Sequence, residues 1–186
     1  MIHKRRALGW LLLVCWFTWI QAGSGWLGAR VLPPAWVPHF GLLLFLAVAA
    51  RLDVRLMARR NERAGYAGLV LAAAASEIAL TVQAPAPVLA GWIGLLGWQN
   101  LWRRGLDVER PLLRILVSGS GAAVLLLWRT LVLDLDLAAS SGPIDADFLY
   151  ADAGAWRGVL LTAALAPLVM PLSLALPGIG LYWRKR

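Results

Sequence analysis

Three kinds of residue are scarce in this chain of 186 amino acids. Cys15 is the single cysteine, so no disulfide can form within the chain. His3 and His39 are the two histidines, and neither stands at a metal-ligand spacing from cysteine or aspartate, so we expect no metal site. Charged residues make up 15% of the chain, whereas a typical soluble domain has about 25%. Composition therefore argues against a soluble protein.

Hydrophobic residues make up 60% of the chain and form long uncharged runs separated by short basic clusters. This pattern predicts an all-α integral membrane protein. We expect residues 1–186 to form a single transmembrane domain, because the length leaves room for one helical bundle. The formal net charge of +8 is also found in proteins that bind nucleic acid. We exclude that partner, because basic clusters between apolar runs are typical of cytoplasmic loops that border membrane lipids.

Six apolar runs are candidates for transmembrane helices. A helix needs about 20 residues to cross a hydrocarbon core of about 30 Å. We expect helices at about residues 7–22, 36–50, 65–82, 88–101, 111–133 and 158–183. The glycine-rich stretch Gln21–Gly28 is expected to be a loop. The last run is long, and its prolines, Pro167, Pro171 and Pro177, are expected to kink or end it.

The first run follows three basic residues, Lys4, Arg5 and Arg6, and this arrangement is also typical of a secretory signal peptide. The run contains three tryptophans and no clear small-residue cleavage site. These features favour a retained helix over a cleaved signal, and both interpretations stay open from the sequence.

The basic residues fall largely on one side when six spans are assumed. Fifteen of the 18 lysines and arginines lie on the side of the two termini, and the exceptions are Arg30, Arg129 and Arg157. Positively charged loops stay in the cytoplasm, so both termini are predicted to be cytoplasmic. The loop at 134–156 contains five aspartates and is predicted to face outward.

One basic loop has a regular spacing. Arg51, Arg55 and Arg59 stand four residues apart and would form a basic face on a helix, beside an apolar strip. Such a face suits the surface of an anionic leaflet. The alternative is a plain cytoplasmic loop that fixes topology. The residues concerned are Arg51, Arg55, Arg59, Arg60 and Arg63.

Glu77 is the only charged residue between Ala64 and Trp102. A carboxylate is costly inside a bilayer and marks a candidate functional or packing residue. Arg129 is a second isolated charge. At about 1.5 Å per residue, the two lie at nearly the same depth, in the outer half of the bilayer.

Two arrangements of these charges are open from the sequence. Glu77 and Arg129 could form an ion pair, which would lower the cost of burying each. In the alternative, Arg129 extends toward the outer headgroups and Asp134, while Glu77 is protonated or hydrogen-bonded to Ser118 or Ser120.

Signatures of enzymes are weak. Ser118-Gly119-Ser120-Gly121 looks like a serine-nucleophile loop, but a serine nucleophile needs a base, and neither histidine stands deep in a predicted helix. The sequence contains no phosphate-binding loop and no dinucleotide fingerprint. We therefore expect no enzymatic activity and no cofactor.

Three stretches resemble the MreD family of bacterial rod-shape membrane proteins. They are Pro34–Phe45, which leads the second predicted helix with prolines, the alanine-rich Gly68–Glu77, and the ending from Pro171 to Trp183-Arg184-Lys185-Arg186. The resemblance covers most of the chain as a layout of helices and loops rather than as sequence identity.

This resemblance implies a non-enzymatic scaffold of the peptidoglycan-elongation machinery in the inner membrane. Its implied partner is a single-pass periplasmic protein of the MreC type. It also implies a fold similar to the substrate-binding subunits of energy-coupling-factor transporters. The alternative function is therefore a small-molecule-binding transporter subunit, with Glu77 lining a pocket open to the outside.

Two features separate these functions. A binding subunit should bury several polar groups around one cavity. A scaffold should expose a groove of small or apolar residues, for which Gly91, Gly94 and Gly97 or the stretch 118–123 are candidates.

Overall fold

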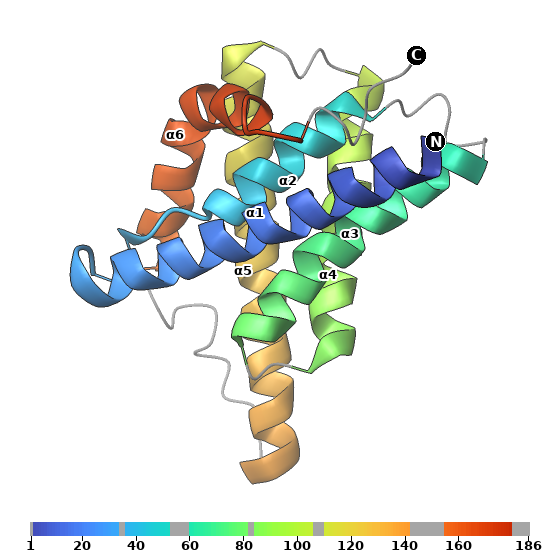
Figure 1. Ribbon diagram of the computed structural model, residues 1–186. Helices are drawn as coiled ribbons and strands as arrows, with labels where there is room; N and C mark the ends of the chain where they lie inside the picture. The colour runs from blue at the N-terminus through green and yellow to red at the C-terminus, as the bar shows by residue number, and fades with distance from the viewer. Residues whose placement is uncertain are drawn as a thin grey trace.

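The computed structural model describes residues 2–33, 36–52, 60–81, 84–105, 110–141 and 155–179. Within these ranges the chain forms six α-helices and no strand (Figure 1). The helices are α1 (Ile2–Arg30), α2 (Phe40–Arg51), α3 (Arg60–Leu80), α4 (Pro85–Gly105), α5 (Pro111–Ser141) and α6 (Ala155–Leu174). The all-helical class predicted from composition is confirmed for the described ranges.

Three helical stretches are long and apolar enough to cross a membrane. They are Ala7–Arg30 in α1, Pro111–Val132 in α5 and Trp156–Leu174 in α6. Phe40–Arg51 and Ala64–Leu80 are also apolar but shorter. The described chain therefore has the helices of a membrane protein, as its composition predicts.

Helix α2 is the centre of the bundle. It packs against each of the other five helices, and every residue from Gly41 to Ala49 is buried. The run Phe40–Ala50 has no polar side chain, and a helix that is apolar on all sides is normally enclosed by other elements. Around α2 the core is completed by residues of all five other helices, among them Leu13, Phe17, Leu69, Trp92, Leu95, Leu125 and Met170.

The prediction of a loop at Gln21–Gly28 is wrong, because α1 continues to Arg30. Glycine is more frequent in membrane helices than in soluble ones. In apolar surroundings a segment keeps its backbone groups hydrogen-bonded by remaining helical. The Ser24 hydroxyl also donates to the Ile20 carbonyl within the same helix, at 2.8 Å.

The predicted start of the second helix at residue 36 is also wrong, because α2 begins at Phe40. Pro38 disfavours helical backbone at the preceding Val37. The stretch before α2 is held by α6 instead: the His39 amide donates to the Thr162 hydroxyl at 2.9 Å, and the Arg157 guanidinium lies 5.3 Å from the Trp36 ring centroid.

Helices α4 and α5 both begin with proline, Pro85 and Pro111, which is tolerated in the first turn because its missing N–H would have no helical partner there. Both run past their predicted ends at 101 and 133, to Gly105 and Ser141. The third helix begins earlier than predicted, at Arg60, and ends at Leu80.

Helix α6 ends at Leu174, short of the predicted end at 183. Pro167 and Pro171 lie inside it, and Figure 1 shows that α6 changes direction toward its red end. The chain then turns at Gly178, whose φ of 80° is in the left-handed region that favours glycine. Residues 180–183 of the predicted helix lie outside the described part of the chain.

Candidate functional site

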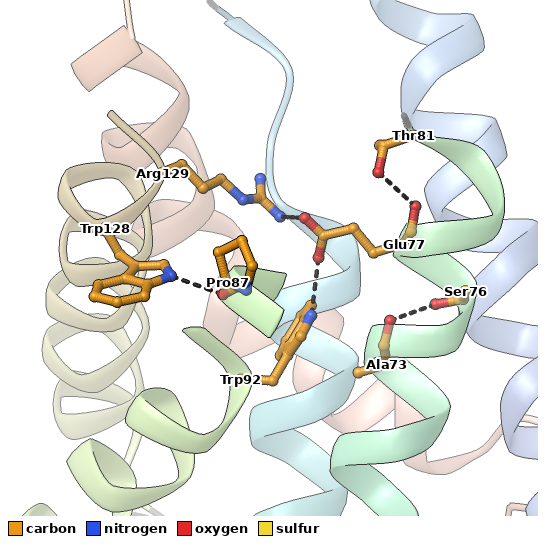
Figure 2. Close-up of polar contacts among 8 residues, drawn as sticks. All are labelled: Ala73, Ser76, Glu77, Thr81, Pro87, Trp92, Trp128 and Arg129. Atoms are coloured by element: carbon orange, nitrogen blue, oxygen red, sulfur yellow. Dashed lines mark hydrogen bonds and ion pairs between the residues drawn. The ribbon is translucent and has the colours of Figure 1, made fainter. Parts of the chain in front are cut away.

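Glu77 lies in the last turn of α3 and is almost enclosed, with 7% of its side chain exposed. The turns before it are rich in alanine, and Ala72, Ala73 and Ala74 are buried. Short side chains let neighbouring helices come close to α3. The Glu77 carboxylate points into the bundle, toward α4 and α5 (Figure 2).

Both oxygens of the Glu77 carboxylate accept a hydrogen bond from another helix. Arg129 Nη2 of α5 donates to Oε1 at 2.5 Å, and Trp92 Nε1 of α4 donates to Oε2 at 2.8 Å. The indole of Trp92 is buried, whereas 31% of the Arg129 side chain is exposed. One carboxylate thus joins three helices, and the charges of Glu77 and Arg129 compensate each other.

The same region of α4 and α5 is fixed by a second indole. Trp128 Nε1 donates to the Pro87 carbonyl at 2.8 Å (Figure 2). Gly91 faces this ring: a β-carbon built at Gly91 would lie 2.9 Å from Trp128 Cδ1. Glycine at position 91 therefore allows the close approach of α5 that brings Arg129 to Glu77.

Of the two arrangements open from the sequence, the structure has the ion pair. Neither serine contacts Glu77. Ser118 donates to the Arg114 carbonyl of its own helix at 2.6 Å. Ser120 donates to the Leu116 carbonyl and accepts a hydrogen bond from Trp98 Nε1 at 3.2 Å. The side chain of Asp134, named in the alternative, lies outside the described ones.

The two candidate grooves have different environments. In the stretch 118–123, a β-carbon at Gly119 would lie 3.0 Å from Ala163 of α6, so this stretch packs inside the bundle. Gly91 is likewise buried. Gly94 and Gly97 are exposed, and a β-carbon at either position would have no neighbour within 4 Å.

The basic segment is described only in part. Arg51 ends α2 and is exposed. Arg55 and Arg59 lie outside the described residues, and for Arg60 and Arg63 only the helical backbone of α3 is described.

A cavity of about 600 Å³ adjoins the ion pair, and we call it the polar cavity. It lies between the second half of α1, the segment 37–42 that leads into α2, the last turn of α3, the first half of α4 and the middle of α5. Its polar lining comprises Gln21, Ser24, His39, Glu77, Thr81 and Arg129, and its apolar lining includes Leu80, Trp92 and Leu125.

Of the polar lining, sequence reasoning missed Gln21, Ser24 and His39, and of the apolar lining it missed Leu80, Trp92 and Leu125. A signal existed for Trp92, because a buried indole N–H needs an acceptor and Glu77 is the only carboxylate in that stretch. Gln21 and Ser24 stand in the segment that the sequence predicts to be a loop, so the sequence did not predict that they lie on a helix. Among the described residues, no group of three His, Cys, Asp or Glu side chains could hold a metal ion.

No protein-family model, curated protein or solved structure matches this chain. Inferences about its function therefore depend on its own residues and geometry.

Proposed function

We propose that the chain is a non-enzymatic scaffold of the bacterial inner membrane, similar to MreD, that acts in the cell-shape and peptidoglycan-elongation machinery. In this proposal all six helices span the membrane, both termini are cytoplasmic, and the arrangement is similar to that of the substrate-binding subunits of energy-coupling-factor transporters. The proposed partner is a single-pass protein of the MreC type.

The main support for this proposal is the outer face of α4. Its exposed residues are Ala90, Ile93, Gly94, Gly97 and Leu101. The two glycines have open space beyond them, so another helix could approach the α4 backbone closely there. Large exposed side chains, Ile93 and Leu101, flank the glycines and could pack on either side of such a helix.

The polar cluster formed by Glu77, Arg129 and Trp92 supports the same proposal. The Glu77 carboxylate has both oxygens occupied by Arg129 and Trp92, which suits a group that fixes helix packing. A cluster of this kind holds α4 against α3 and α5, and thereby keeps the outer face of α4 in one orientation.

In-cell crosslinking tests the scaffold. A photoreactive residue at Ile93 should capture a single-pass partner, whereas one at Leu160, a residue of α6 that is at least as exposed, should capture less of it. Gly94→Leu should abolish the Ile93 crosslink. Gly23→Leu is the matched control, because a β-carbon at Gly23 also meets open space but lies on α1. Crosslinks to membrane lipids alone at Ile93 would reject the proposal.

Cysteine labelling tests the topology. Because Cys15 is the single cysteine, a Cys15→Ser chain provides a background without thiols. In intact spheroplasts a membrane-impermeant maleimide should label a cysteine placed at Asp145 and should leave one placed at Arg186 unlabelled. The reverse pattern, or labelling at both, would reject six spans with cytoplasmic termini.

The polar cavity favours a second candidate, a small-molecule-binding subunit of a transporter. Six polar side chains line one space of about 600 Å³, which is within the range of about 300–1,000 Å³ typical of ligand sites. Purification with a transporter ATPase module, rather than with a cell-wall protein, would favour this candidate over the scaffold.

A further inference from the structure

A second cavity adjoins the polar cavity on the other side of α1. It also has a volume of about 600 Å³ and lies between α1, the start of α2 and the end of α6; we call it the apolar cavity. Ala22, Ser24 and Phe40 line both cavities, so the two spaces are neighbours. The remaining lining of the apolar cavity is Trp19, Ile20, Gly23, Trp26, Leu27, Val169 and Ser173.

Arg129 presents unused donors to the polar cavity. A guanidinium has five N–H donors. Among the described residues, Glu77 is the only acceptor for Arg129, through Nη2. A guanidinium matches phosphate and carboxylate in geometry and can bridge two anions from its two edges. The free edge of Arg129 is therefore a place for a second anionic group beside Glu77.

The start of α2 adds positive potential to the same space. His39, Phe40, Gly41 and Leu42 line the polar cavity, and the His39 side chain makes no capping hydrogen bond. The first amides of a helix have no partners in the helix and carry a partial positive charge. In α2 the His39 amide donates to the Thr162 hydroxyl and the Phe40 amide to the Pro38 carbonyl, which leaves the amides of Gly41 and Leu42 for this space. This partial charge and Arg129 together outweigh the single carboxylate of Glu77.

The geometry points to a site for an amphiphile that has one phosphate in its headgroup and a hydrocarbon tail. The phosphate lies in the polar cavity against Arg129, and the tail passes Phe40 into the apolar cavity between Trp19 and Trp26. A membrane phospholipid has this chemistry. The site does not depend on the scaffold proposal, because it uses α1, α2, α5 and α6 and leaves the outer face of α4 free.

Three ligands separate the contributions of head and tail. The purified protein, in an uncharged maltoside detergent, is titrated with short-chain phosphatidylglycerol, with diacylglycerol of the same tails, and with glycerol phosphate. Bound ligand is counted by native mass spectrometry. We expect phosphatidylglycerol to bind at least about tenfold more tightly than either of the others, which corresponds to about 1.4 kcal/mol.

Glycine substitutions then separate the two cavities. A β-carbon at Gly23 or at Gly25 would have no neighbour within 4 Å, so leucine can be accommodated at both positions. Gly25 lines the polar cavity and Gly23 the apolar one. Either Gly25→Leu or Gly23→Leu should lower the affinity for phosphatidylglycerol at least about fivefold. Gly94→Leu on α4, equally open, is the control and should leave binding unchanged.

Two variants test the contribution of charge. Glu77→Gln keeps an acceptor for Trp92 and leaves Arg129 charged, so it should bind phosphatidylglycerol as tightly as wild type or more tightly. Glu77→Gln combined with Arg129→Gln removes both charges and should lose the preference for phosphatidylglycerol over diacylglycerol. Circular dichroism must show the same helix content for both variants.

Several outcomes would overturn this site. If diacylglycerol binds as tightly as phosphatidylglycerol, the phosphate contributes nothing to binding and the proposed phosphate site is wrong. Glycerol phosphate that binds as tightly as the lipid, with an affinity unaffected by Gly23→Leu, would mean that the site takes soluble phosphates and not a lipid. Phosphatidylglycerol binding that is the same in Gly23→Leu, Gly25→Leu and Gly94→Leu places the lipid elsewhere. None of these outcomes bears on the Ile93 crosslink, so the scaffold proposal stands or fails separately.

Discussion

Replacement of Glu77 by alanine should destabilise the bundle through two separate effects. Trp92 Nε1 loses its acceptor while its side chain stays buried, which costs about 1–3 kcal/mol. Arg129 loses its counter-ion, and breaking a buried pair in this way costs about 3–5 kcal/mol. Because 31% of the Arg129 side chain is exposed and it lines the polar cavity, it can turn into that space and recover part of that cost. We therefore expect a total loss of about 3 kcal/mol.

The assay is equilibrium unfolding of the purified protein in mixed micelles of dodecyl maltoside and SDS, followed by circular dichroism. Glu77→Ala, Arg129→Ala and the double variant form a double-mutant cycle. Contacting residues have coupling energies of about 0.5–3 kcal/mol, and we expect about 2 kcal/mol for this pair. Ser76→Ala is the control, because Ser76 is buried on the same helix and its hydroxyl donates to Ala73.

Two results would refute this reasoning. An equal cost of Arg129→Ala in the wild-type and Glu77→Ala backgrounds would mean that the two side chains do not interact. Interhelical hydrogen bonds in membrane proteins contribute about 0.6 kcal/mol on average. A loss of that size in Glu77→Ala would therefore mean that the cluster is an ordinary polar contact and does not fix the positions of α4 and α5.

Three further substitutions test the packing. Gly91→Ala should cost about 1–3 kcal/mol in mixed-micelle unfolding, because its β-carbon meets the Trp128 ring, whereas Gly94→Ala should cost nothing; equal effects would contradict the close approach. Gly178→Ala should lower the thermal midpoint by forcing a side chain onto left-handed backbone, at about 1–2 kcal/mol, and an unchanged midpoint would refute this. Thr162→Val should cost about 1–3 kcal/mol by removing the acceptor of the His39 amide, and Thr162→Ser should restore it.

The ion pair was accessible from the sequence because helices have a fixed rise. Counting residues from the basic loops places Glu77 and Arg129 at equal depth, and depth is the one coordinate that a membrane helix gives directly. Rotation about the helix axis is not given in this way. The sequence therefore leaves pairing open, whereas the structure, with its three-helix contact, has the pair.

The glycines of α4 illustrate the same limit. Gly91, Gly94 and Gly97 are three residues apart, and each step of three turns the helix by about 300°. Gly91 and Gly97 therefore point in directions about 120° apart and do not share one face. Gly91 is buried against Trp128 while Gly94 and Gly97 are exposed. Which neighbour meets each face depends on contacts across the bundle, and the sequence of α4 alone does not contain them.

The ends of helices were harder to predict than their existence. Gln21–Gly28 has the composition of a loop in water, where exposed backbone can bond to solvent. The same residues are helical here, because they belong to a stretch that is apolar and long enough to cross a membrane, where a helix satisfies its own backbone. Pro38 has the opposite effect, because it disfavours helical backbone before it. Helix α2 therefore begins at Phe40, and His39 and its neighbours line the polar cavity.

Helix α1 is in contact with the segment that follows α6. Trp16 Nε1 of α1 donates to the Pro177 carbonyl at 3.0 Å, across 161 positions of sequence, and Leu12 lies against Gly178. A ribosome that adds about 5–20 residues per second needs roughly 8–32 s between synthesis of these two partners. For that interval α1 must wait in the membrane with one side uncovered. The bundle can therefore close around α1 only after Pro177 and Gly178 have been synthesised.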